Sequence, residues 1–262
     1  MPGLRGTPCR GRHRESALMR QRLIAAFGAA LIFGFVAVPH PAPAEAEHWQ
    51  AVLVAGDTAQ PVFDNAVHAV AAWLAGQGVP EADIHRLSAG AGPRSPAIEP
   101  ATLRQVLDRI ASLQSRPGDR CFIFITSHGG RGLGIYLSRS DEMLRPAALA
   151  QALARGCAGV PTVVVVSGCY SGSFARAPMA APNRIILTAA RADRSSFGCA
   201  ADRTYTDYDA CLLASLAHAT TWQATFGETR GCVARRERQL GETPSLPQAS
   251  FGAVVRKLPL EF

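Results

Sequence analysis

The sequence lacks the short motifs that mark several cysteine-based functions. It has no C-x-x-C motif, and its seven cysteines are not interleaved with histidines at the spacing of a zinc site. The first absence argues against a thiol redox protein, and the second argues against structural zinc. We therefore expect neither a metal nor a cofactor. No internal repeat or second domain is recognisable along the 262 residues, a length that one large domain can fill.

The sequence also lacks a real excess of basic charge outside its N-terminal segment. Six of the 27 Lys and Arg residues, but one of the 20 acidic residues, fall within residues 1–44, which leaves 21 basic against 19 acidic residues in the remainder. The net charge of +7 is therefore mainly a property of that segment. Nucleic-acid binding requires a basic surface, so we expect no nucleic-acid partner.

The N-terminal segment has the three parts of a secretory signal peptide. Six arginines precede an apolar run, Leu23–Val38, and small-residue cleavage sites follow within residues 42–46. This order predicts a signal peptide over residues 1–44, with Met19 as an alternative start, and a single domain over residues 45–262. The protein would then be periplasmic or extracellular and would not stay inserted in a membrane. The alternative is a membrane anchor, for which sixteen apolar residues are a marginal length.

Export would allow disulfides among the six cysteines that follow the signal peptide. Cys121 opens an apolar strand, so we expect it to be a plain buried residue. Cys169 is a candidate for chemistry, which requires its thiol to stay free. One bridge would then form within a pool that consists of Cys199, Cys211 and Cys232, with Cys157 as a further candidate.

Apolar strands alternate with amphipathic helices along the chain. We expect strands at residues 51–56, 84–87, 162–166 and 184–190, and one that ends at His128 and is followed by a short segment at residues 135–138. We expect helices at residues 63–75, 102–113, from Pro146 onward and over most of 207–238. The Gly- and Pro-rich residues 88–100 indicate a flexible surface connection, and residues 241–252 an extended tail packed on the body. This order predicts an α/β fold with a mainly parallel central sheet and helices on both faces.

Two of these strands end in reactive side chains. The stretch TVVVVSGCYSGSF, Thr162–Phe174, is a run of β-branched residues followed by a small-residue turn that carries Cys169. The stretch RCFIFITSHGGR, Arg120–Arg131, is a buried strand followed by His128 and two glycines. The carboxyl ends of parallel strands meet at one edge of a sheet, where ligands bind. Cys169 and His128 are therefore predicted to share a site.

This pair of residues can perform nucleophilic catalysis. An accessible Cys169 thiolate would be the nucleophile, and His128 would take the thiol proton and return it to a leaving amine. The backbone N–H groups of Gly129 and Cys169 could form an oxyanion hole, since Gly129 has no side chain to block a carbonyl oxygen. The sequence identifies no third residue to orient the histidine. Each residue alone also fits a structural role, as a buried thiol or a loop histidine.

The two motifs together resemble those of the legumain-type cysteine peptidases, which have a caspase-like fold. The similarity rests on SHGG, Ser127–Gly130, and on SGCYSGSF, Ser167–Phe174, and it extends over residues 51–216. It implies a caspase-like three-layer sandwich. It also implies that His128 and Cys169 form the catalytic dyad of a cysteine peptidase.

A third stretch, LTAARADRSSFGCAAD, resembles the strand and loop that line the primary specificity pocket of that family. By this resemblance Ser196 lines the substrate pocket, and Asp207 or Asp209 is its acidic member. Ser167 stands in the pocket where the family has an acidic residue, and the loop GDTAQPVFDNA lacks the family's Arg-His pair. A pocket without that cation and that anion would not recognise an asparagine amide in the same way. The resemblance therefore implies peptidase chemistry without strict asparagine specificity.

The leading hypothesis is an exported cysteine endopeptidase of the legumain type, which cleaves a peptide or protein substrate through a thioester intermediate. Capture of the thioester by an amine instead of water would make it a transpeptidase. The alternative is a non-catalytic caspase-like module that serves as a binding or scaffold domain, which the changed pocket residues motivate. The presence of both His128 and Cys169 argues against that alternative, whereas a disulfide at Cys169 would favour it.

Overall fold

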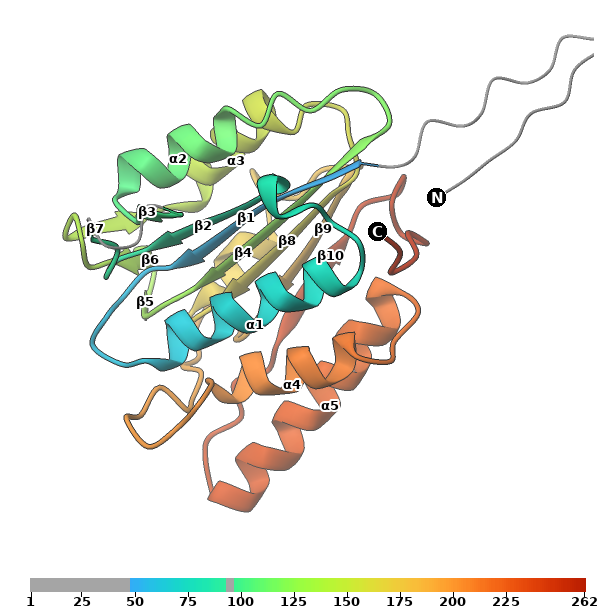
Figure 1. The fold of residues 1–262 in the computed structure, drawn as a ribbon. Coiled ribbons are helices and arrows are strands. Elements are labelled where there is room, and N and C mark those ends of the chain that lie inside the picture. The colour runs from blue at the N-terminus through green and yellow to red at the C-terminus, as the bar shows by residue number, and fades with distance from the viewer. Residues whose placement is uncertain (1–47, 93–96) are drawn as a thin grey trace, which may run out of the picture. The chain divides into compact units, whose positions relative to one another are not determined.

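The computed structural model describes residues 48–92 and 97–262 (Figure 1). The predicted signal peptide over residues 1–44 lies outside the described residues, so the signal peptide and the domain boundary behind it stay predictions. None of the helices within the described ranges could span a membrane.

The described residues form a central sheet of seven strands in the order β10-β9-β8-β4-β1-β2-β3. Neighbouring strands are parallel, except that β10 is antiparallel to β9. The strands are β1 (His48–Ala55), β2 (Ile84–Ser88), β3 (Ile98–Pro100), β4 (Asp119–Thr126), β8 (Thr162–Ser167), β9 (Arg184–Thr188) and β10 (Gln248–Phe251). A small antiparallel sheet contains β5 (Gly129–Gly130), β6 (Gly134–Leu137) and β7 (Glu142–Leu144). The predicted mainly parallel central sheet is confirmed.

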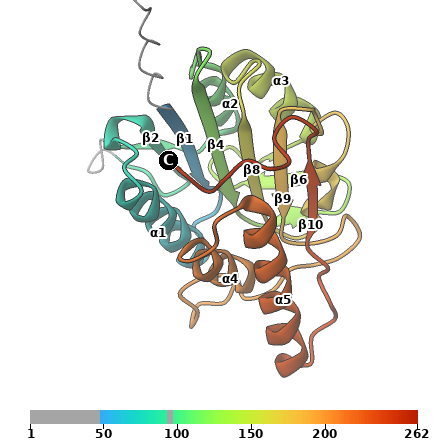
Figure 2. The ribbon, with the colours of Figure 1, turned by 90° about the vertical axis from the view of Figure 1, so that its right-hand side faces the viewer.

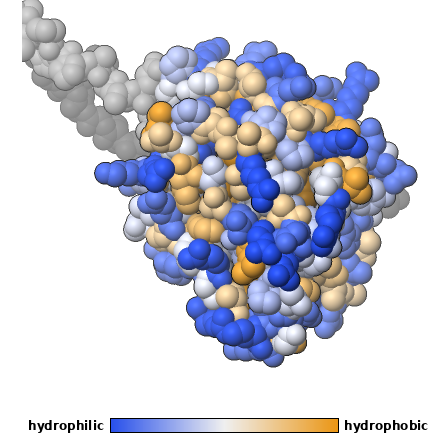
Figure 3. All heavy atoms as spheres, turned by 180° about the vertical axis from the view of Figure 1, so that it is seen from behind, coloured by the Kyte–Doolittle hydropathy of each residue, from blue (hydrophilic) through white to orange (hydrophobic). Residues whose placement is uncertain are grey.

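Helices cover both faces of the central sheet (Figures 1 and 2). One face carries α1 (Val62–Gly76), α4 (Asp207–Leu216) and α5 (Trp222–Leu240), and the other carries α2 (Leu103–Ala111) and α3 (Pro146–Gly156). Two short 3-10 helices, η1 (Glu81–Asp83) and η2 (Ser171–Ala175), lie in connections. Hydrophilic side chains are spread among small apolar areas on the side opposite to that of Figure 1 (Figure 3). The predicted three-layer α/β arrangement is therefore confirmed.

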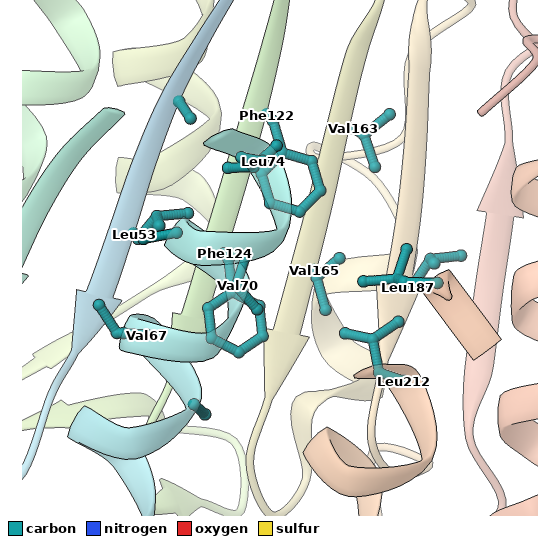
Figure 4. Close-up of a cluster of buried hydrophobic side chains, with 14 of the residues drawn as sticks. Leu53, Val67, Val70, Leu74, Phe122, Phe124, Val163, Val165, Leu187 and Leu212 are labelled. Carbon is teal, nitrogen blue, oxygen red and sulfur yellow. The ribbon is translucent and has the colours of Figure 1, made fainter. Parts of the chain in front are cut away.

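Burial on both faces explains why the central strands are almost wholly apolar. Side chains of a strand point alternately to the two faces, so Phe122 and Phe124 pack with α1 whereas Ile123 and Ile125 pack with α2 and α3. Figure 4 shows the α1 side of the core. The side chains labelled there are Leu53, Val67, Val70, Leu74, Phe122, Phe124, Val163, Val165, Leu187 and Leu212. Because both faces of these strands are buried, accessible reactive side chains lie in the loops beyond the strand ends.

In three segments the structure adds detail to what periodicity predicts. The helical region expected over residues 207–238 is two helices, and Thr221 begins the second one by accepting a hydrogen bond from the Ala224 N–H at 3.1 Å. Residues 88–100, expected to be a flexible connection, contribute the edge strand β3. The extended tail expected at residues 241–252 contributes β10 at the opposite edge. Such short edge strands form because they pair with a neighbouring strand, and the periodicity of their own residues does not predict that pairing.

A disulfide joins Cys121 to Cys157, with their Cα atoms 6.2 Å apart. The expectation that Cys121 is a plain buried residue is therefore wrong. Cys121 pairs in register with Thr162, the first residue of β8, and its N–H donates to the Pro161 carbonyl oxygen at 3.0 Å. This pairing brings the end of α3, at Cys157, beside the start of β4. An apolar pattern predicted the burial of Cys121 but carried no information on its partner.

A second disulfide, Cys211–Cys232, lies within the predicted pool and joins α4 to α5. Among the described residues, Cys169 and Cys199 are the cysteines that remain free. The free thiol of Cys169 is what nucleophilic chemistry requires. It also removes the disulfide that would have favoured a scaffold role.

Candidate active site

The carboxyl ends of β4 and β8 lie side by side at one edge of the central sheet. The two strands are parallel neighbours, and their last register pair is Thr126 with Ser167. His128 follows β4 and Cys169 follows β8, so both side chains leave the sheet at the same edge. Both line one narrow pocket. The fold thus brings together the two residues that the sequence places at separate strand ends.

The same pocket contains Ser167 and Ser196, the two serines predicted to line a substrate pocket. The rest of its wall consists of aromatic, hydroxyl, thiol and glycine residues, namely Phe63, Ser127, Gly168, Phe197, Cys199 and Thr206. The described lining residues include no Lys, Arg, Asp or Glu. The described lining therefore combines aromatic and hydroxyl groups without a carboxylate, ammonium or guanidinium group.

A sharp turn places Cys169 just beyond the carboxyl end of β8. The next residue, Tyr170, has a left-handed backbone with a φ of 58°, which is uncommon for a residue with a side chain. Its N–H donates to the Arg194 carbonyl oxygen at 2.8 Å, and the Arg131 guanidinium lies 5.3 Å from the centre of its ring. Surroundings that hold such a conformation are typical of functional sites. The 3-10 helix η2 begins directly after Tyr170.

Ser196 supplies the hydrogen-bond partners of the Cys169 sulfur. The Ser196 N–H donates to Sγ at 3.3 Å, and the Ser196 hydroxyl can donate to it at 3.7 Å. The thiol can in turn donate to the Ser196 carbonyl oxygen at 3.5 Å. These contacts hold the sulfur beside the loop that carries Ser196. The resemblance placed Ser196 in the pocket, but its contact with the sulfur comes from the structure.

Asp57 stands beside His128 and was not identified from the sequence. Its Oδ2 lies 4.0 Å from the Nε2 of His128, and its side chain is 9% exposed. The Ala59 N–H donates to the other carboxylate oxygen, Oδ1, at 2.8 Å. The His128 ring also packs edge-on against Phe63, with 5.2 Å between ring centres. The sequence does show Asp57 directly after Gly56, which ends the first predicted strand. It does not show that this strand lies next to β4, because that depends on the strand order.

Gly129 brings the loop after β4 into direct contact with the nucleophile's backbone. A Cβ atom on Gly129 would overlap the carbonyl oxygen of Cys169 and lie 3.1 Å from its nitrogen. No side chain fits in this space, which explains a glycine at this position. Gly129 also pairs with Ile135 in the small sheet, which holds the loop in place. The backbones of the two residues predicted to form an oxyanion hole are thus neighbours.

The structure places Asp207 outside the residues that line the pocket. Its carboxylate is buried and accepts a hydrogen bond from Arg236 Nε at 2.8 Å, with Arg203 Nη1 at 3.7 Å. Its N–H donates to the carbonyl oxygen of Phe197, which does line the pocket, at 3.0 Å. Asp207 therefore holds the pocket loop in place, and its negative charge is compensated by arginine.

Cys199 is the second free thiol at the pocket. Burial raises the pKa of Cys199, and the neighbouring Cys169 adds to the effect. Its thiolate is therefore disfavoured relative to an ordinary cysteine. Among residues 48–92 and 97–262, no group of three or more His, Cys, Asp and Glu side chains is arranged to hold a metal ion.

Comparisons with known proteins point the same way as the geometry. The model of the peptidase C13 family matches residues 102–255. Among solved structures, caspase-1 from Spodoptera frugiperda is similar, with a TM-score of 0.57 and 14% identity over 82% of this chain and 92% of that chain; at such an identity the likeness concerns the fold. The curated proteins contain no match. Because the family model matches more than half of the chain, the protein belongs to the peptidase C13 family, the legumain family, and is a cysteine-type peptidase with a caspase-like fold.

Proposed function

We propose that the protein is an exported cysteine endopeptidase in which Cys169 is the nucleophile, His128 is the general base and acid, and Asp57 orients the imidazole. The observation that carries this assignment is the shared pocket of Cys169 and His128 at the ends of adjacent parallel strands. Asp57 adds support because its carboxylate faces one ring nitrogen of His128. The other ring nitrogen is then left for proton exchange with the substrate and the thiol.

In the first half of the proposed reaction, His128 takes the thiol proton and the Cys169 sulfur attacks the carbonyl carbon of the scissile bond. The backbone N–H groups of Gly129 and Cys169 stabilise the oxyanion of the tetrahedral intermediate. The C–N bond then breaks, and the imidazolium gives its proton to the leaving amine, which leaves a thioester on Cys169.

In the second half, a water molecule gives a proton to His128 and attacks the thioester. The carbon–sulfur bond breaks, the carboxylic product leaves, and the proton returns to the Cys169 sulfur. An amine in place of water would form a new peptide bond, so the same groups support transpeptidation. Whenever His128 carries the transferred proton, the carboxylate of Asp57 stabilises the positively charged imidazolium.

The pocket supports a preference for a small, uncharged side chain on the amino side of the cut bond. The pocket is narrow, and its polar lining includes the hydroxyl groups of Ser167, Ser196 and Thr206. Asp207 lies outside the residues that line the pocket, and Arg236 donates to its Oδ1 at 2.8 Å. A hydroxyl-lined pocket without a matched cation and anion has little means of selecting asparagine over other small residues.

Export is proposed from the leader over residues 1–44. The two disulfides support it, because structural disulfides persist in oxidising compartments such as the periplasm and the extracellular space. The leading alternative to catalysis, a scaffold domain, is motivated by the changed pocket residues, but Cys169 is free and lies in a pocket with a histidine, which favours catalysis.

Covalent labelling tests the proposed nucleophile. A peptidyl acyloxymethyl ketone should label the wild-type protein on Cys169, as located by mass spectrometry of the digested protein. Cys169→Ala should abolish the label and His128→Ala should slow it strongly. Cys199→Ala removes the other free thiol of the pocket and should leave the label on Cys169. Undiminished labelling of a folded Cys169→Ala protein would contradict the assignment.

A further inference from the structure

The three side chains assigned to the reaction stand just beyond three adjacent parallel strands. Asp57 follows β1, His128 follows β4 and Cys169 follows β8. The register pairs Thr126 with Ala55 on one side and with Ser167 on the other, at the last position of each strand. Thr126 is therefore the central residue of the edge from which all three side chains project.

Thr126 is fully buried, and its polar groups reach in two directions. Its carbonyl oxygen accepts a hydrogen bond from the Gly56 N–H, next to Asp57, at 3.0 Å. Its hydroxyl donates to Oδ2 of Asp209 at 2.8 Å, across 83 positions in the sequence. The end of the central strand is thus tied both to the strand that carries Asp57 and to α4.

Asp209 is the buried acid at the other end of this contact. It lies in the first turn of α4, and its N–H donates to the hydroxyl of Thr206, a pocket residue, at 3.1 Å. The hydroxyl of Ser167 lies beside its carboxyl group. Its Oδ1, however, has no well-formed hydrogen bond to any of the described residues.

Burial raises the pKa of Asp209, and the surrounding hydroxyls of Ser167, Thr126 and Thr206 oppose that shift only in part. The environment therefore favours the neutral acid more than water does. Removing such a group from water costs free energy that an apolar residue of similar size would not incur. A buried acid at this position calls for a role beyond stability.

We propose that Asp209 is a positioning residue of the peptidase. By holding Thr126 and lying against Ser167, it fixes the relative positions of the strand ends that carry His128 and Cys169. This proposal rests on the function proposed above for those two residues. Asp209 itself does not touch the reacting atoms, so it acts only through the strand ends.

Two substitutions remove the contact from its two ends. Thr126→Val deletes the donating hydroxyl and keeps the shape, and Asp209→Leu deletes the acceptor at similar size. Each should lower kcat about tenfold to 10²-fold, the cost of a small misplacement of reacting groups, with little change in KM. Asp209→Asn keeps an acceptor oxygen and the neutral state, so it should restore most of kcat.

Thr225→Val is the matched control for Thr126→Val. Thr225 is also fully buried, but its hydroxyl donates to the Thr221 carbonyl oxygen within α5 at 3.0 Å. It should cost stability and leave kcat unchanged. The measurements are kcat and KM with a cleaved peptide, the thermal midpoint, and the pH dependence of Cys169 alkylation by iodoacetamide, which responds to the spacing of the sulfur and the imidazole.

Wild-type kcat in folded Thr126→Val and Asp209→Leu proteins would overturn the proposal, and so would an equal loss in Asp209→Asn and Asp209→Leu. If Asp209→Leu does not fold, Thr126→Val decides alone. A failure of the proposed function looks different, because the wild-type protein itself would then cleave no peptide and carry no label on Cys169.

Discussion

Replacement of Gly129 by alanine tests whether the loops after β4 and β8 must meet as closely as they do. The new Cβ would overlap the Cys169 carbonyl oxygen and lie 2.9 Å from the Cys169 carbonyl carbon. Carbon atoms in contact prefer a separation of about 3.5–4.0 Å. The atoms in the way belong to the backbone, so no side-chain rotation relieves the overlap. The two loops must separate by about 1 Å.

Such a displacement acts directly on the spacing of His128 and Cys169. Misplacement of reacting groups by about 1 Å costs on the order of 10²-fold in rate, which corresponds to about 2.7 kcal/mol in activation free energy. We therefore expect Gly129→Ala to lower kcat by about 10²-fold. Overpacking should also lower the free energy of unfolding by about 1–3 kcal/mol.

The assay is steady-state cleavage of a fluorogenic peptide chosen from a library with the wild-type protein, alongside thermal unfolding followed by circular dichroism. Gly227→Ala in α5 is the control, because a Cβ there meets no atom within 4 Å. It should keep the wild-type kcat and gain roughly 0.5–1 kcal/mol of stability. A folded Gly129→Ala protein with a kcat close to that of the wild type would refute the reasoning.

Three further predictions concern titratable groups near the site. Asp57→Ala should lower kcat by roughly 10²-fold, because the imidazolium loses its carboxylate; unchanged steady-state kinetics would rule out an orienting role. The rate of Cys199 alkylation by iodoacetamide should be low at neutral pH and should increase in alkaline solution, because burial raises the pKa of Cys199. Mass spectrometry at a series of pH values measures this rate, and a Cys199 that reacts as fast as a free cysteine would contradict the prediction. Asp209 has a raised pKa in the folded protein, so the folded state keeps a proton that the unfolded chain loses near pH about 3.9. The wild type should therefore lose stability relative to Asp209→Asn as the pH rises from about 4 through the folded-state pKa, and a difference in thermal midpoint that does not vary with pH would contradict this.

Local sequence determined the order and type of most elements. Runs such as TVVVVS in β8 have no polar alternation, so they predict strands buried on both faces, and the structure has them there. The helices α1 and α2 follow from apolar residues at helical spacing. Local patterns were sufficient because the periodicity of a segment reports which of its sides is buried.

The sequence by itself also placed the proposed dyad. His128 and Cys169 each follow an apolar strand, and parallel strands end at the same edge of a sheet. The sequence also indicated that Gly129 allows a close approach at this site, and the Gly129 backbone does contact that of Cys169. The SHGG and SGCYSGSF motifs pointed to the family that the family model then showed.

Only the tertiary structure decided which strand ends are neighbours. The order β8-β4-β1 brings Asp57 beside His128, and the docking of α4 brings Asp209 onto Thr126. The packing of the elements also determines the Cys121–Cys157 disulfide, because it depends on where the end of α3 lies along the sheet. Periodicity records that a residue is buried but not what it is buried against. Partners distant in sequence are chosen by the packing of the whole sheet, and the residues proposed to orient and position the dyad are such partners.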